Sequence, residues 1–336
     1  MAGIIAGALI SAVAWADEAL PRGAAEPASA VLDARVWLKR IQDSTYRRSF
    51  TGTFVVSSGG AMSSARITHY CDGHSQIERV DALDGQLRSV FRHDDVVHTL
   101  WPASRQAVVE QREPLRGFPA LVGGGGRHGA LAYEALPERV DRIAGHEAQV
   151  LLLKSRDDLR FSQRLWSEKN TGLLLRADTL GAQGEVLESS AFSELALGAR
   201  LQPALLMQEM NRLEGYRVLR PVTVRTDLAR EGWVLREAVP GFVSLSCIKR
   251  PLEPTAAQVP EQGAFLLQAI YSDGLTHVSI FIEPGETGSG RLEGLSTQGA
   301  TSSLSARRGD WWITVVGDVP AATLRRFAAS IERRKP

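Results

Sequence analysis

The sequence predicts an α+β protein with a large antiparallel sheet and helices, followed by a smaller C-terminal α+β domain. The central observation is residues 159–197, where turn clusters at 168–172 and 181–184 separate three apolar-rich runs at hairpin spacing. Short connections of this kind make successive strands antiparallel neighbours, which is a meander. Short strands also fill most of the remaining chain without alternating with helices. At 336 residues, with 44% hydrophobic and 23% charged residues, the chain is long enough for two globular domains.

The first residues are typical of an export signal. An apolar run from Ile4 to Val13 precedes Ala14-Trp15-Ala16, a small-residue pattern typical of a cleavage site. The run of about 10 residues is too short to cross a bilayer as a helix. We expect a signal peptide at 1–16 and a flexible lead-in at 17–28; the alternative is an ordinary buried helix.

The first domain is expected at residues 29–215. It begins with a helix at 29–44, whose Ala34, Trp37, Leu38 and Ile41 recur at helical spacing. A second helix is expected at 204–215. The β-branched and aromatic runs between the two helices predict strands at 49–56, 65–70, 75–82, 87–93, 96–101, 107–110, 148–154 and the meander.

A linker at 216–230 is expected to lead into a smaller second domain at 231–336. Ser272-Asp273-Gly274 separates two apolar runs, 265–271 and 276–282, which predicts a hairpin. Another strand is expected at 310–316. Pro320 stands where a proline commonly opens a helix, and the residues after it have an apolar face at helical spacing.

The segment 114–132 interrupts the strand pattern with two prolines and four consecutive glycines. It carries the apolar residues Leu115, Phe118 and Leu121. The sequence leaves two interpretations open, a lid over the neighbouring sheet or an untethered surface loop.

The two cysteines, Cys71 and Cys247, lie one in each half of the chain. In an exported protein such a pair is a candidate disulfide that links the domains. The alternative is two buried thiols, because spacing cannot reveal whether the side chains meet.

Motifs of enzymatic chemistry are absent from the sequence. It has no G-x-S-x-G, C-x-x-C, H-E-x-x-H or P-loop pattern, so no catalytic residue, metal ligand or cofactor is predicted. His93 and His98 are five residues apart and point away from each other on a strand, which favours a polar turn over a metal site. A net charge of +1 gives no indication of nucleic-acid binding.

A binding protein is therefore the expected class. A broad sheet crossed by a helix can leave an apolar concavity. The alternative for each apolar side chain is an ordinary filled core. The candidate lipid-pocket residues are Trp37, Leu38, Phe54, Val56, Phe91, Trp101 and Trp166.

Short motifs in both halves resemble those of a known family. The motifs are Ser49-Phe50-Thr51-Gly52-Thr53-Phe54, Arg142-Ile143-Ala144-Gly145, Leu165-Trp166, Thr171-Gly172-Leu173-Leu174-Leu175-Arg176, Gly232-Trp233, Pro240-Gly241-Phe242, Tyr271-Ser272-Asp273-Gly274-Leu275 and Gly317-Asp318-Val319-Pro320. In this order the chain resembles the RseB/MucB family of periplasmic regulators of the sigma-E (AlgU) envelope-stress response. Its first domain resembles the LolA-like lipid-binding fold.

The resemblance implies a LolA-like half-barrel domain joined to a smaller partner-binding domain. It also implies that the protein binds the periplasmic part of a membrane-spanning anti-sigma factor (RseA or MucA in the family) and shields it from the site-1 protease. Lipopolysaccharide or another acyl lipid is expected to relieve that protection. A lipid or lipoprotein carrier similar to LolA is the alternative function, and a hydrolase with a long-range triad is a third. The oligomeric state, a homo-oligomer included, stays open.

Overall fold

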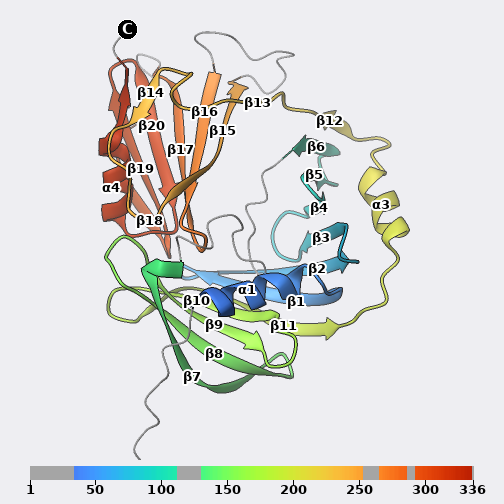
Figure 1. Ribbon diagram of the computed structural model, residues 1–336. Helices are drawn as coiled ribbons and strands as arrows, with labels where there is room; N and C mark the ends of the chain where they lie inside the picture. Colours follow the sequence, from blue (N-terminus) through green and yellow to red (C-terminus); the bar gives the residue numbers. More distant parts are fainter. Residues whose placement is uncertain (1–33, 112–129, 253–264, 286–291, 335–336) are drawn as a thin grey trace, which may run out of the picture. The chain divides into compact units, whose positions relative to one another are not determined.

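The computed structural model describes residues 34–111, 130–252, 265–285 and 292–334. These residues form a twelve-stranded sheet, a seven-stranded sheet and a two-stranded ribbon, with helices beside the two large sheets (Figure 1). The predicted α+β class, with a large antiparallel sheet and a smaller C-terminal sheet domain, is confirmed. We call the part built on the larger sheet the first domain and the part built on the smaller sheet the second domain.

The larger sheet is two meanders joined edge to edge. Its order is β12-β6-β5-β4-β3-β2-β1-β11-β10-β9-β8-β7, so β1 and β11 join the halves. All neighbours are antiparallel except β12, which runs parallel to β6. The strands are β1 (Phe50–Ser58), β2 (Ala61–Cys71), β3 (Gln76–Ala82), β4 (Ser89–His93), β5 (Val96–Trp101), β6 (Gln106–Gln111), β7 (Tyr133–Ile143), β8 (His146–Ser155), β9 (Ser162–Glu168), β10 (Leu174–Leu180), β11 (Val186–Leu197) and β12 (Arg217–Leu219).

The meander predicted from residues 159–197 is confirmed as β9, β10 and β11. Its first turn is closed by Glu168, whose backbone oxygen accepts from the Gly172 nitrogen at 2.8 Å. The side chain of Glu168 also accepts from the Asn170 nitrogen at 3.1 Å. The apolar run in β8, next in the sheet, has buried residues on both faces, which explains why it does not alternate.

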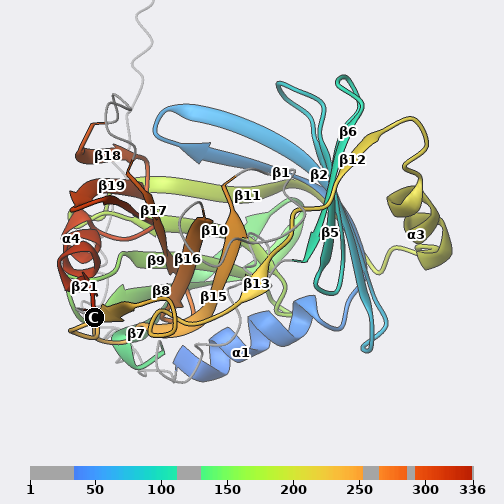
Figure 2. The same ribbon diagram turned by 90° about the horizontal axis from the view of Figure 1, so that it is seen from above.

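Helix α1 (Ala34–Thr45) covers one face of the second meander. Its Leu38 and Ile41 pack with Leu151, Leu153 and Leu165. The part of the expected helix before residue 34 lies outside the described residues. Figure 2 shows α1 in blue along β7 and β8 and α3 near β6 and β12. Helix α3 (Pro203–Asn211) ends four residues before the expected position.

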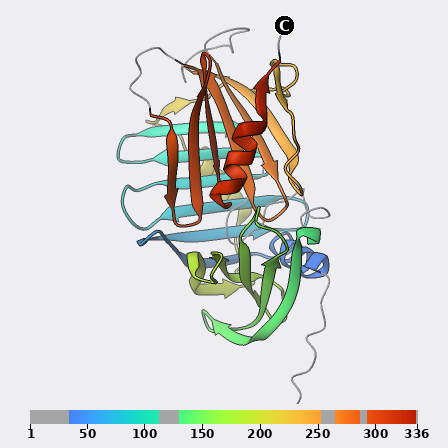
Figure 3. The same ribbon diagram turned by 90° about the vertical axis from the view of Figure 1, so that its left-hand side faces the viewer.

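The second domain packs one helix on its sheet. The sheet order is β13-β15-β16-β17-β20-β19-β18, and α4 (Ala321–Ser330) lies across one face (Figure 3). The hairpin expected around residues 272–274 and the helix after Pro320 are confirmed. The strands are β13 (Val224–Arg225), β15 (Val243–Pro251), β16 (Phe265–Ser272), β17 (His277–Pro284), β18 (Gly294–Gln298), β19 (Thr301–Arg308) and β20 (Trp311–Gly317), while β14 (Trp233–Leu235) and β21 (Ile331–Arg333) form the ribbon.

The expected linker at 216–230 contributes a short strand to each sheet. Strand β12 pairs with β6 of the first domain, and β13 pairs with β15 of the second. The expected signal peptide and lead-in, and the lid residues Leu115, Phe118 and Leu121, fall outside the described residues. Among the helices of the described ranges, none combines the length and apolar character that crossing a membrane requires.

Candidate functional site

The structure distributes the seven predicted lipid-pocket side chains over different clusters. Trp37 and Leu38 belong to the α1 cluster on one face of the larger sheet. Phe54 and Trp166 belong to a cluster built around Phe50 and Phe192. The remaining positions are Phe91 in a third cluster beside α3, and Val56 and Trp101, which are half-buried. The structure does not gather the seven into one pocket, so a shared lipid site for them stays a prediction.

The cluster around Trp166 is filled by protein side chains. The indole nitrogen of Trp166 donates to Asp141 Oδ2 at 3.1 Å, and the Arg176 guanidinium carbon lies 4.5 Å from the centre of an indole ring. Phe54 packs edge-on against Phe192 with ring centres 6.3 Å apart. These contacts give Trp166 a packing partner and a polar partner at once, as a buried tryptophan needs.

Phe91 lies beside an open cavity. It packs with Leu100, Ala107 and Met210, so it holds α3 against the first meander. Next to this cluster is a cavity of about 410 Å³, bounded by the sheet on one side and α3 on the other. An ion pair of 2.7 Å between Arg79 Nη1 and Glu209 Oε2 lies at its wall. Of the seven predicted residues, Phe91 alone lines either of the two cavities described for this structure.

A second cavity, of about 500 Å³, adjoins the face of the second sheet that α4 does not cover. Alternation along the strands produces this face: Leu267, Ala269 and Ile280 point into the core with α4, whereas Ile270 and Phe281 point the other way. Ile248 of β15 lies on the same face, opposite Gln268. An antiparallel sheet usually turns polar side chains to a face that no helix covers. Here that face carries a buried Ile270 and the half-buried Ile248 and Phe281, which gives the cavity an apolar floor.

Charged side chains from both domains surround these apolar residues. The first domain contributes Arg92, Asp95 and Glu110, and the second contributes Arg250. Arg225 of β13 completes the set. A cavity with an apolar floor and a rim of both charge signs suits an extended peptide, whose side chains alternate between the floor and the rim.

The two cysteines are buried thiols in different domains. Cys71 Sγ contacts the backbone oxygen of Tyr46, and Cys247 lies in the second-domain core. Burial raises the pKa of the Cys247 thiol to about 12, so the reactive thiolate is scarce at neutral pH. The structure contains the two residues as separate thiols and not as the candidate disulfide.

We expect a thiol titration of the purified protein to detect two thiols in denaturant without reductant, and far slower reaction in the native state. Detection of no thiol until reductant is added would mean that the cysteines pair. The mass of the alkylated chain gives a second count and serves as the control.

His93 and His98 each have a polar partner within the protein. His93 Nε2 lies 3.1 Å from Ser75 Oγ, and His98 Nδ1 lies 2.8 Å from the Met210 backbone oxygen. Within the four described ranges, no three His, Cys, Asp or Glu side chains converge as metal ligands would. His98 thus helps to hold α3 on the sheet.

Comparison with known proteins identifies relatives along both domains. Residues 33–210 match the MucB/RseB N-terminal domain, and residues 227–332 match the MucB/RseB C-terminal domain. The chain is 29% identical over 316 residues to the sigma factor AlgU regulatory protein MucB of Pseudomonas aeruginosa, covering 91% of this chain and 93% of that protein. It is 25% identical over 309 residues to the sigma-E factor regulatory protein RseB of Escherichia coli K12, covering 92% of each.

Solved structures agree with this relationship. A crystal structure of MucB in complex with MucA(peri) superposes with a TM-score of 0.66 at 27% identity, over 90% of this chain and all of that one. A Pseudomonas aeruginosa MucA/MucB complex gives a TM-score of 0.67 at 27% identity, over 91% of this chain. The N-terminal family model alone spans more than half of the sequence. The chain belongs to the MucB/RseB family.

Proposed function

We propose that this protein is a periplasmic negative regulator of a sigma-E-type envelope-stress response, which binds the periplasmic part of a membrane-spanning anti-sigma factor. The observation that carries the proposal is the likeness, over both domains, to MucB in complex with MucA(peri). The names of the curated relatives, which describe regulators of sigma factors, support it further.

The cavity of about 500 Å³ is the binding site that we propose for a segment of the anti-sigma factor. Both domains line it, and its floor of Ile248, Ile270 and Phe281 would take apolar side chains of the segment. The rim charges would select acidic or basic neighbours of those side chains and would keep the peptide extended. Bound in this way, the segment would be withheld from the site-1 protease.

The proposed release by lipid follows from linkage. If lipopolysaccharide or another acyl lipid binds the free protein more tightly than the complex, it weakens the complex by the same factor. The cavity of about 410 Å³ beside Phe91 and α3 is the place that we propose for an acyl chain, because apolar Phe91 and Leu100 reach its wall. Whether the lipid site is this cavity or a wider part of the first domain is decided by labelling with a photoreactive fatty acid.

Calorimetry tests the proposal directly. The secreted chain is titrated with the periplasmic segment of its own organism's anti-sigma factor, with and without lipopolysaccharide below its aggregation threshold. We expect specific binding that the lipid weakens, together with protection of the segment from the site-1 protease. Lipid uptake at defined stoichiometry with no binding of the segment would instead identify a carrier similar to LolA.

Replacement of Ile248 by aspartate is expected to weaken binding of the anti-sigma segment by at least about tenfold. The change places a charge on the apolar floor, and loss of one apolar anchor commonly costs about 1.4 kcal/mol or more. Calorimetry of the Ile248→Asp variant measures the effect.

The matched control for Ile248→Asp is Leu295→Asp, at a 40% exposed leucine on β18 at the edge of the same sheet. It introduces the same charge outside the residues that line the cavity. Equal affinities for the two variants would place the segment elsewhere on the protein.

A further inference from the structure

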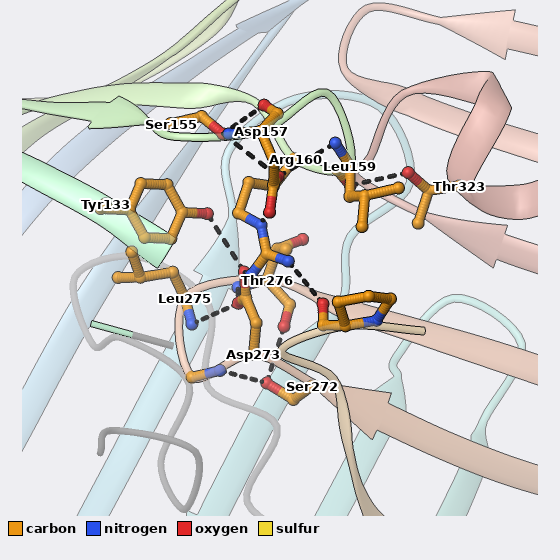
Figure 4. Close-up of polar contacts among 12 residues, drawn as sticks. Tyr133, Ser155, Asp157, Leu159, Arg160, Ser272, Asp273, Leu275, Thr276 and Thr323 are labelled. Atoms are coloured by element: carbon orange, nitrogen blue, oxygen red, sulfur yellow. Dashed lines mark hydrogen bonds and ion pairs between the residues drawn. The ribbon is translucent and has the colours of Figure 1, made fainter. Parts of the chain in front are cut away.

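One arginine of the first domain is buried at a junction with the second. Arg160 lies in the connection between β8 and β9, and its side chain is 0% exposed. The connection is shaped by Asp157, whose Oδ1 accepts from the Leu159 nitrogen and from Arg160 Nε, each at 3.0 Å. The local fold therefore holds the guanidinium by one nitrogen and directs the other two away from its own loop (Figure 4).

The second domain supplies acceptors for those two nitrogens. Arg160 Nη1 donates to Asp273 Oδ2 at 2.9 Å, and Nη2 donates to the Pro240 backbone oxygen at 2.7 Å. The ring centre of Phe242 lies 5.1 Å from the guanidinium carbon. The three guanidinium nitrogens thus donate to three separate acceptors, in the fork geometry that only arginine provides.

Asp273 is fixed by its own turn before it meets the arginine. It is 0% exposed and lies between β16 and β17, where its Oδ1 accepts from the backbone nitrogens of Leu275 and Thr276, each at 2.9 Å. Its other oxygen, Oδ2, accepts from Arg160 and also from the hydroxyl of Tyr133 at 3.2 Å. Both carboxylate oxygens are therefore used, and the carboxylate position is set by the turn.

Apolar residues are exchanged across the same junction. Leu159, beside the arginine, packs into the core of the second domain, and its backbone oxygen accepts from Thr323 Oγ1 at 2.7 Å. In return Leu275, beside the aspartate, packs into the α1 cluster of the first domain. Each domain therefore inserts one leucine into the other, with the ion pair between the two leucines in the structure.

We propose that the Arg160–Asp273 pair is a latch that fixes the two domains against each other, and that Arg160 acts as a positioning residue for partner binding. The inference rests on the proposed function, because the cavity offered to the anti-sigma segment is lined from both domains. A buried ion pair is a weak source of net stability, but removal of one partner is costly. Each charge accepts only the matching geometry, and loss of one partner leaves the other charge buried and unpaired.

The test compares three single variants of the whole secreted chain with one control. Arg160→Met removes the charge, Asp273→Asn keeps the turn acceptor but loses the charge, and Arg160→Lys keeps the charge but loses the fork. Arg156→Met makes the same chemical change at an exposed position of the same loop. Scanning calorimetry, small-angle scattering and titration with the anti-sigma segment are measured for each.

We expect each of the three latch variants to unfold in two transitions instead of one and to have a larger radius of gyration than wild type. Each should also bind the anti-sigma segment at least tenfold more weakly. Arg160→Lys should resemble Arg160→Met, since one ammonium cannot reach three acceptors. Arg156→Met should match wild type.

Loss of affinity with an unchanged far-UV circular dichroism spectrum separates a positioning role of Arg160 from a general loss of fold. If Arg160→Met fails to fold, the other two variants carry the same comparison, because Asp273→Asn conserves the side-chain shape and Arg160→Lys conserves the charge.

Two results would overturn the inference. A single transition and an unchanged scattering curve for Asp273→Asn would show that the pair does not hold the domains together. An opened junction with undiminished affinity would show that it does not position the partner site. If the wild-type chain does not bind the segment at all, the proposed function fails, whereas calorimetry and scattering still decide whether the latch exists.

Discussion

Replacement of Gly52 by alanine is expected to lower the free energy of unfolding by about 2–3 kcal/mol, the upper part of the range for overpacked sites. A Cβ atom at this position would lie 2.5 Å from the Glu194 backbone oxygen and 2.8 Å from the Phe192 ring. Backbone cannot give way as a flexible side chain can. The phenyl ring is also confined, because Phe50 and Phe54 pack edge-on against it with ring centres 6.1 Å and 6.3 Å away.

The position of Gly52 in the sheet makes the effect global. Gly52 pairs with Leu195 of β11, in the one pairing that joins the two meanders of the larger sheet. A displaced β1 therefore separates two halves of the sheet and does not merely loosen an edge. Equilibrium denaturation in urea, followed by far-UV circular dichroism, measures the change.

Gly294→Ala is the matched control for Gly52→Ala. Gly294 also lies in a strand, but a Cβ atom there meets nothing within 4 Å. Its stability should stay within about 0.5 kcal/mol of wild type, as is usual for surface substitutions. An unchanged denaturation midpoint for Gly52→Ala would contradict the pairing of β1 with β11.

Sequence patterns predict the elements that depend only on residues close together in the chain. The turn at 168–172 and the hairpin around Asp273 join neighbouring strands, so turn residues and apolar runs suffice to place them. Strand β7 was missed because Pro137 and the charges after it argue against a strand. As the edge strand of its sheet, β7 tolerates both the proline and a shift of register there.

The functional surface depends on long-range relations that a single sequence does not contain. Trp166 is predicted as a pocket residue because it is aromatic and apolar. Its partners Asp141 and Arg176 come from other strands and fill the space around it. Arg160 was not singled out, because its partner Asp273 is 113 residues away. The available signal is indirect. The turns at Pro240-Gly241-Phe242 and Ser272-Asp273-Gly274 belong to the motifs that resemble the family, and both supply contacts to Arg160.

Gly241 in the first of those turns offers a test of the latch that changes no charge. Replacement by alanine is expected to destabilise the protein by about 2–4 kcal/mol and to open the domain junction as Arg160→Met does. The backbone φ of Gly241 is +81°, which costs an alanine about 1–2 kcal/mol. The added Cβ would also lie 2.8 Å from Arg160 Nη1 and 2.9 Å from Nη2.

A side-chain end so close would ordinarily move aside, but this one is restrained. The Arg160 nitrogens are held by Asp157, Asp273 and Pro240, so any displacement breaks a hydrogen bond of the buried guanidinium. Gly232→Ala separates the two costs, because Gly232 has a φ of +79° and nothing within 4 Å of its Cβ position. Calorimetry should therefore show strain alone for Gly232→Ala, and strain plus an opened junction for Gly241→Ala. In an Arg160→Met background the excess cost of Gly241→Ala should shrink, since residues in contact do not act additively. Equal losses for the two glycine variants would mean that the guanidinium does not press on this turn, and that the junction is held by the exchanged leucines without the ion pair.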